Sequence, residues 1–271
     1  MSLLNFYFSD HSNEVISRGS NHSVLGITNG HYSQGAIQYR HPGTNAVCSD
    51  DIRYIEPAQE SSGWGGNAAG ATLLDHIPNL DNFTMSCWAD AKTLGFWTIP
   101  FLLRQNNQWR FSIDYETTSS NTLYVYISYY SPEGGYHWTY TSFALPDNNW
   151  HYLTVTKTRD DALRFYVNGE LKVTKTTAAG EYVLLDDTPV EMSFRSDQQN
   201  NFHNPGARLG NLRFDTSAAT AEQIRAQMLE DLELLKNPHV LDVKQDSFTN
   251  NNAAVLSNYP AHPQIPLENT L

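Results

Sequence analysis

The segment from Trp150 to Val173 constrains the fold of this chain more than any other feature. Its sequence, WHYLTVTKTRDDALRFYVNGELKV, alternates apolar and polar residues in two runs, which is the pattern of half-buried β-strands. Asn168-Gly169 ends the second run, and both residues readily take the positive φ angles of a tight hairpin turn. The segment therefore predicts the middle of an antiparallel meander.

The rest of the chain extends this all-β pattern. Strands are predicted over residues 3–8, 35–39, 72–77, 83–92, 96–103, 108–115, 122–130, 136–143, 190–194 and 207–214. The capping box Thr220-Ala221-Glu222-Gln223 precedes apolar residues at helical spacing and predicts one helix at about 220–236. We expect a single domain over residues 1–245.

Two segments depart from the strand pattern. Residues 41–70 contain Pro, Gly and the run SSGWGGNAAG, and they are predicted to form an irregular loop insertion. Residues 246–271 combine prolines with an Asn run and read as an extended C-terminal arm without its own core. Both segments are candidates for contact with a partner.

Composition excludes several classes of partner. The net charge of −12 argues against nucleic acid and anionic membranes, because both need a basic surface. No apolar run is long enough to span a membrane, and the N-terminus lacks the basic and apolar parts of a secretory signal. Cys48 and Cys87 are too few for a disulfide framework, and whether they pair is left open.

The order of these elements resembles a known family. WHYLTVTKTRDDALRFYVNGELKV resembles the central signature of concanavalin A-like, laminin-G-like jelly-roll domains, in which a strand opened by Trp-His precedes one ending in Tyr-Val-Asn-Gly. The segments LLNFYFSD, DNFTMSCWA and GARLGNLRFDTSAATAEQIRAQM are similar to other parts of that family, so the resemblance covers roughly residues 1–236. It implies an antiparallel jelly-roll sandwich, a fold shared by lectins, glucanases, pentraxins and adhesion modules.

The sequence shows no catalytic constellation. The resemblance implies that a glucanase would carry two or three carboxylates on one strand, in a Glu-x-Asp-x-x-Glu pattern, and this pattern is absent. Asp114 and Glu116 share a strand face but have no third partner, and a turn separates Glu191 from Asp197. Nucleophilic triads, zinc motifs and phosphate loops are also missing. We therefore expect no enzymatic activity.

Calcium is left open, because several relatives of the resembled family bind it in rim loops. The candidate oxygen ligands are Asp75, Asp81-Asn82, Asp147-Asn148-Asn149, Asp186-Asp187, Asp197 and Asn200-Asn201. None of these has a spacing that specifies a metal site, and ordinary turn chemistry explains each of them.

Aromatic side chains along three central strands give the strongest binding signal. Leu123, Val125, Ile127 and Tyr129 share the parity that should face the core. The opposite parity, together with its neighbours, carries Tyr124, Tyr126, Tyr130, Trp138 and Tyr140 beside Arg110, Ser112 and Asp114. Such a face suits sugar stacking or a protein interface, and a third alternative is that the insertion or the arm covers it. Trp64, in the insertion, is a further candidate contact.

Two functions follow from these features. The preferred prediction is a non-enzymatic structural or interaction protein of a large assembly, specifically a bacteriophage virion protein made in the cytoplasm, whose partners are copies of itself or other virion proteins. The alternative is a lectin-like module that binds cell-surface glycans, with calcium as an open question. A glycan hydrolase is the least favoured class.

Overall fold

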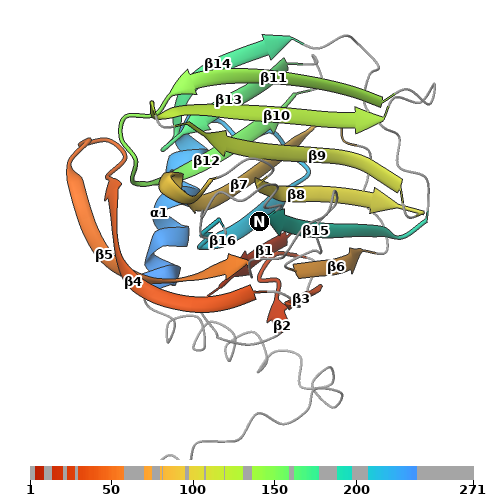
Figure 1. Ribbon diagram of the computed structural model, residues 1–271, viewed down its shortest axis with the longest axis horizontal. Helices are drawn as coiled ribbons and strands as arrows, with labels where there is room; N and C mark the ends of the chain where they lie inside the picture. Colours follow the sequence, from red (N-terminus) through yellow and green to blue (C-terminus); the bar gives the residue numbers. More distant parts are fainter. Residues whose placement is uncertain are drawn as a thin grey trace, which may run out of the picture. The chain divides into compact units, whose positions relative to one another are not determined.

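Two antiparallel sheets pack face to face in the computed structural model of the chain, and one helix follows them (Figure 1). The structure describes residues 4–8, 14–20, 23–27, 30–57, 70–74, 80, 82–94, 98–106, 108–118, 120–130, 136–158, 162–176, 188–196 and 207–236. The chain divides into two units, residues 1–236 and 237–271, and the second lies outside the described residues. The predicted arm and the domain boundary at residue 245 therefore stay predictions.

Sheet A contains the segment from which the fold was predicted. In spatial order its strands are β1 (Leu4–Tyr7), β16 (Asn211–Asp215), β7 (Phe83–Asp90), β12 (Trp150–Lys157), β13 (Ala162–Val167) and β14 (Glu170–Thr176). A long hairpin of β4 (Gly30–Arg40) and β5 (Val47–Pro57) joins this sheet through a short parallel contact with β12.

Sheet B carries the three strands whose outer face is aromatic. Its strands are, in spatial order, β11 (Tyr136–Ala144), β10 (Thr122–Tyr130), β9 (Gln108–Thr117), β8 (Thr98–Gln105), β15 (Val190–Ser196), β6 (Gly70–Leu74), β3 (Val24–Ile27) and β2 (Glu14–Ile16). The 3-10 turn η1 (Ala91–Thr93) follows β7 of the facing sheet. The predicted all-β jelly-roll sandwich is confirmed.

Alternating apolar side chains from the two sheets form one core. Met85 and Cys87 of β7 and Leu153 of β12 meet Phe111 and Ile113 of β9 in a single buried cluster. Because side chains on a strand alternate between its two faces, the residues between these core positions must point outward. The core therefore fixes which side chains each sheet presents on its outer face.

The Asn-Gly turn after β13 takes the predicted geometry. Asn168 and Gly169 have φ angles of 53° and 74°, and the Asn168 side chain accepts a hydrogen bond from the Tyr152 amide at 2.9 Å. His151 is fully buried beside this turn, where its Nε2 lies 3.0 Å from the Asp147 carbonyl and its Nδ1 lies 3.2 Å from Asn168 Nδ2. Since a carbonyl only accepts, Nε2 carries the proton. His151 is thus a packing residue, as predicted.

Helix α1 (Ala221–Lys236) covers the outer face of sheet A. Its N-terminus has the predicted capping box, because the Gln223 amide donates to Thr220 Oγ1 at 3.2 Å and the Thr220 amide donates to Gln223 Oε1 at 2.8 Å. Ile224, Met228 and Leu232 are buried, as the apolar stripe predicted.

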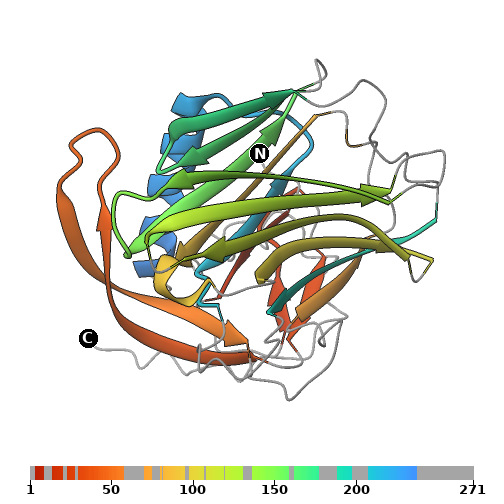
Figure 2. The same cartoon turned by 45° about the horizontal axis from the view of Figure 1, so that its top comes forward.

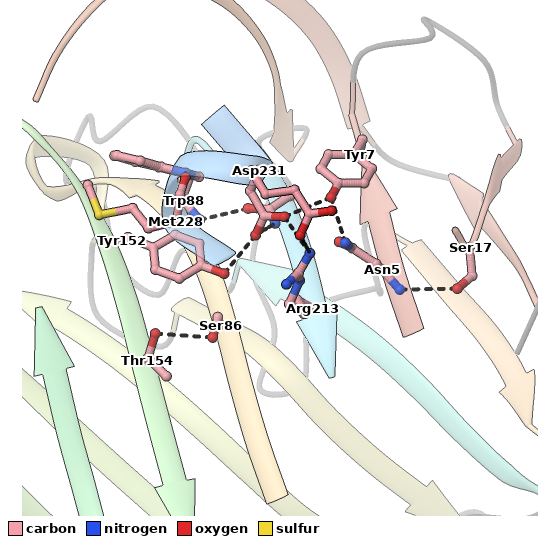
Figure 3. Close-up of polar contacts among 12 residues, drawn as sticks. Asn5, Tyr7, Ser17, Ser86, Trp88, Tyr152, Thr154, Arg213, Met228 and Asp231 are labelled. Atoms are coloured by element: carbon pink, nitrogen blue, oxygen red, sulfur yellow. Dashed lines mark hydrogen bonds and ion pairs between the residues drawn. The ribbon is translucent and has the colours of Figure 1, made fainter. Parts of the chain in front are cut away.

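A buried aspartate fastens this helix to the sheet (Figure 3). Asp231 is fully buried and accepts hydrogen bonds from the hydroxyls of Tyr7 at 2.7 Å and Tyr152 at 2.6 Å and from Asn211 Nδ2 at 2.8 Å. Arg213 Nη2 pairs with the same carboxylate at 2.8 Å. Burial and the nearby Asp231 raise the pKa of Tyr7 and of Tyr152, so both hydroxyls remain donors.

The expected irregular insertion over residues 41–70 is wrong in its first half. Residues 47–57 form β5, which pairs along its whole length with β4, and Figures 1 and 2 show this hairpin projecting beside α1. The turn signals at Pro42 and Gly43 mark the hairpin tip, where Gly43 and Asn45 have positive φ. Residues 58–69 lie outside the described part of the chain. Cys48 lies on β5 and is not bonded to the buried Cys87, since both are free.

Replacing Asp231 with alanine should lower the free energy of unfolding by about 3–5 kcal/mol, because it leaves the buried Arg213 charge and two tyrosine hydroxyls without their acceptor. Urea unfolding followed by tryptophan fluorescence measures the change. Glu233→Ala is the control, since this exposed residue only pairs with Lys236 on the helix surface and its loss should cost less than about 0.5 kcal/mol. Similar losses for the two variants would contradict the proposed role of Asp231.

Candidate ligand-binding face

Four aromatic side chains on β10 and β11 form a partly exposed patch, which we call the aromatic face: Tyr124, Tyr126, Trp138 and Tyr140. Trp138 and Tyr140 are 60% and 50% exposed, whereas Tyr124 and Tyr126 are half-buried. The alternation predicted from the sequence holds, because Leu123, Val125 and Ile127 lie in the core between them. The alternative that the insertion or the arm covers this face stays a prediction, since residues 58–69 of the insertion and the whole arm lie outside the described residues.

The strand register brings these rings together. Tyr140 lies directly opposite Tyr126, with ring centroids 5.8 Å apart, and Tyr126 lies opposite Asp114 of β9. The Tyr124 and Tyr126 planes differ by 17° and the Trp138 and Tyr140 planes by 19°, whereas rings on facing strands are tilted by 32° to 39°. The two nearly parallel rings of each strand make a surface against which a flat apolar ligand face can pack.

Polar contacts hold two of the tyrosines in place. The Tyr126 hydroxyl donates to Glu116 Oε2 at 3.2 Å, and burial together with this carboxylate raises the pKa of Tyr126 to about 12. Lys175 of β14 donates to the Tyr140 carbonyl at 2.8 Å, at the edge where β11 and β14 approach each other. The aromatic face is therefore fixed by backbone register and by two polar contacts.

Asp114 is a buried acid beside the aromatic face. Its side chain is 3% exposed, its Oδ1 has no hydrogen-bond partner, and no described cation pairs with it. Burial raises the pKa of Asp114 to about 7, although the neighbouring Ser112 acts in the opposite direction. An unpaired buried carboxylate costs stability, and groups of this kind concentrate at functional sites.

Further unpartnered polar atoms continue from Asp114 across the sheet. Ser112 of β9 lies opposite Leu102 of β8, which lies opposite Ser193 of β15. Ser112 and Ser193 are buried, and neither hydroxyl makes a hydrogen bond of 3.5 Å or less, although Ser112 lies near enough to Asp114 to lower the pKa of that acid. Buried polar groups are almost always paired in folded proteins, so these hydroxyls, which have almost no solvent-exposed surface, lower the stability of the sheet and do not offer an open binding site.

Arginine and glutamate side chains lie at the far end of β8 and β9. Arg104 Nη1 and Glu191 Oε1 are 3.5 Å apart, and the buried Nε of Arg110 has no hydrogen-bond partner. Of the predicted site residues, Tyr124, Tyr126, Trp138, Tyr140 and Asp114 thus gather at one place, with Arg110 on the same strand as Asp114. Trp64 and the side chain of Tyr130 lie outside the described residues.

The row through Ser193 could not be found from the sequence. Its signal depends on β15 pairing with β8, and these strands are separated by 84 residues between Gln105 and Val190. Hydrophobic alternation assigns each residue to a face but does not say which strands are neighbours. The hydrogen bond between Tyr126 and Glu116 was missed for a different reason, because the sequence analysis placed Glu116 in a turn whereas β9 continues to Thr117.

Neither a metal site nor a catalytic pair is assembled by the described residues. Within that part of the chain no three His, Cys, Asp or Glu side chains gather, and Asp147 is bonded to Arg40 at 2.8 Å and to the Asn149 amide at 3.0 Å. Asn82 is described, but Asp75, Asp81, Asp186, Asp187, Asp197, Asn200 and Asn201 are not. The calcium question therefore stays a prediction. No described helix is long and apolar enough to cross a membrane.

Two sheets, one covering helix and an exposed aromatic face define a jelly-roll domain of the lectin type. The Laminin_G_3 family model, described as the concanavalin A-like lectin/glucanases superfamily, matches residues 65–225. The chain belongs to this superfamily, as the resemblance implied. A search of curated proteins gave no match.

Solved structures with the same fold include binding domains of clostridial toxins. The botulinum neurotoxin type G receptor-binding domain is 10% identical with a TM-score of 0.52, and the alignment covers 83% of this chain and 50% of that one. The botulinum neurotoxin DC binding domain, solved with rat synaptotagmin II, is 12% identical with a TM-score of 0.50 over 85% of this chain and 51% of that one.

A third structure belongs to botulinum neurotoxin type C, whose cell entry depends on interaction with two ganglioside molecules. It is 14% identical with a TM-score of 0.51, and the alignment covers 85% of this chain and 51% of that one. The chain thus spans about half the length of these structures, and at these identities they show the fold alone.

Replacing Asp114 with asparagine should stabilise the protein at pH 8 and leave it nearly unchanged at pH 4. The raised pKa means that the folded state opposes ionisation of Asp114. The free energy of unfolding that the wild type loses by ionising this acid therefore grows as pH rises from about 4 and reaches its full value above about 7. The gain at pH 8 is at most about 4 kcal/mol, equivalent to raising an aspartate pKa from about 4 to about 7.

Urea unfolding at the two pH values measures this difference. Asp51→Asn, at an exposed position on β5, is the control and should change stability by less than about 0.5 kcal/mol at either pH. Destabilisation by Asp114→Asn at pH 8 would show that Asp114 is paired and structural.

Proposed function

We propose that this chain is a non-enzymatic carbohydrate-binding module whose aromatic face packs against sugar rings. The observation that carries the proposal is the adjacent pair of exposed rings Trp138 and Tyr140, whose planes differ by 19° and which lie beside Tyr126 of the next strand. A sugar ring offers apolar C–H groups on one face and hydroxyl donors around its rim. Its apolar face can therefore pack on the rings while the hydroxyls of its rim stay in solvent.

The small extent of the aromatic face favours a sugar over a protein partner. The face consists of four side chains, of which Trp138 and Tyr140 are exposed, whereas a stable protein interface uses about 20–30 residues on each side. The gangliosides that interact with botulinum neurotoxin type C support a glycan ligand by analogy only.

A protein ligand is the second candidate. Trp and Tyr are enriched at protein interfaces, and Trp138 and Tyr140 lie on β11, which ends its sheet. The synaptotagmin complex of another similar structure gives the same kind of analogy. The preferred sequence prediction, a bacteriophage virion protein that contacts copies of itself, stays a prediction.

The lack of enzymatic activity remains part of the proposal. Asp114 and Glu116 are the acidic residues nearest the aromatic face, and Glu116 accepts the Tyr126 hydroxyl. Asp114 lies on β9 between Ser112 and Glu116, and Glu191 on β15 is paired with Arg104. This leaves no described pair of free carboxylates on one strand to act as acid and nucleophile.

Trp138→Ala and Tyr140→Ala should each weaken binding of a glycan identified on a glycan array by about tenfold. Losing one stacked ring removes on the order of 1–1.5 kcal/mol. Isothermal titration calorimetry with the identified glycan measures the affinity. His137→Ala is the matched control, because His137 is exposed on the same strand but projects to the opposite face, where it stacks on Tyr129. Equal affinities for the three variants and the wild type would contradict the proposal.

A further inference from the structure

The outer edge of β11 (Tyr136–Ala144) is an open strand edge. Among the described residues β11 pairs with β10 alone, and it ends sheet B (Figure 1). Both faces of the strand are accessible to solvent, since the side chains of His137, Trp138, Tyr140 and Ser142 are all exposed. An edge of this kind carries a row of backbone amides and carbonyls that can pair with another chain.

Two hydrogen bonds show which backbone groups lie on this edge. The Leu145 amide donates to the Asn121 carbonyl at 2.8 Å, so Leu145 and every second residue before it bond to β10. Lys175 Nζ donates to the Tyr140 carbonyl at 2.8 Å, which places that carbonyl on the side away from β10. Because the bonding direction alternates along an antiparallel strand, the even-numbered residues of β11 present their amides and carbonyls at the open edge.

β11 lacks the features that keep other strand edges from pairing. β14, the edge strand of sheet A, carries Glu170, Lys172 and Lys175, and its pairing with β13 contains a register shift. β2, at the other end of sheet B, has three residues. β11 has nine residues, an unbroken register with β10, and no Asp, Glu, Lys, Arg or Pro. Charges, prolines, bulges and short strands are the usual means of blocking an edge, so β11 is open to a second strand.

We propose that two copies of this chain associate through β11, whose antiparallel pairing joins two eight-stranded sheets across a two-fold axis at Thr139. In this register Trp138 of each copy lies opposite Tyr140 of the other, and aromatic pairs across strands stabilise a sheet. The edge is thus complementary to itself. The net charge of −12 repels a second copy, but β11 brings no Asp or Glu to the contact.

The pairing doubles the aromatic face. Directly opposed residues of antiparallel strands point to the same side of the sheet, so the rings of both copies lie on one surface. The four aromatic side chains of one copy continue into the four of the second copy across the paired edges. The association itself requires no ligand, and it is therefore independent of the proposed sugar binding.

Lys175 competes with the second copy for the edge. Its amine bonds the Tyr140 carbonyl, which in the pair accepts the Trp138 amide of the second copy. Because the amine lies at the surface and returns to water, exchanging one bond for the other costs little stability. A contact through one strand is smaller than a standard protein interface, so the pair is transient.

Cysteine cross-linking tests the pairing and its register. In a Cys48→Ser background, Thr139→Cys places two thiols across the axis, where directly opposed residues lie within reach of a disulfide. We expect air oxidation to give a covalent dimer. Thr141→Cys is the matched control, because Thr141 is half-buried like Thr139 and lies on the same strand face. In this register its two copies are four residues apart, about 14 Å, which is too far for a disulfide. Equal cross-linking of the two variants, or none in Thr139→Cys, would overturn the proposal.

Sedimentation equilibrium at chain concentrations up to about 1 mM, the range of weak complexes, measures the association without a cross-link. Ser142→Pro should abolish the dimer, because proline lacks the amide that Ser142 presents at the edge, whereas Ser142→Ala should keep it. Circular dichroism checks that both variants are folded. Lys175→Ala should raise the dimer fraction, since it removes the competing amine. A wild-type chain that stays monomeric throughout, or a dimer that survives in folded Ser142→Pro, would contradict pairing through β11 and leave the proposed function standing.

Discussion

The buried ion pair between Asp231 and Arg213 holds helix α1 against sheet A. The division of roles between the two sheets depends on this attachment. One carboxylate joins the helix to strands from both ends of the described chain, because its partners come from β1, β12 and β16. A buried charge pair with its remaining positions hydrogen-bonded is stable only when every partner is present. Helix α1 therefore covers the outer face of sheet A, whereas sheet B has exposed aromatic residues on its outer face.

Sheet B also contains a buried acid, but this one lowers the stability of the fold. Asp231 is surrounded by donors and stabilises the fold, but Asp114 has an unpartnered oxygen and costs stability. Both acids have little contact with solvent, so burial alone does not separate a structural role from a functional one. The two roles differ in the number of hydrogen-bond and ion-pair partners, because an acid without partners does not stabilise the fold that buries it.

The sequence predicts most strands of the sandwich and the four side chains of the aromatic face. Period-two alternation placed Tyr124, Tyr126, Trp138 and Tyr140 on one face, because that property is local to each strand. What it could not predict depends on distant pairings: Ser193 reaches the row only through β8, and Asp231 lies in the buried side of a helix whose apolar stripe gives no sign of it. The β4–β5 hairpin was missed because Gly, Pro and Asn at its tip resemble a long loop.

Hydrogen exchange with and without a glycan identified on a glycan array tests the central claim, that sheet B binds a sugar on the aromatic face. Peptides from β10 (Thr122–Tyr130) and β11 (Tyr136–Ala144) should become more protected when the sugar is bound. Peptides from β5 and α1 should not change, because those elements lie with sheet A. Protection confined to the β4–β5 hairpin or to the helix would contradict the claim.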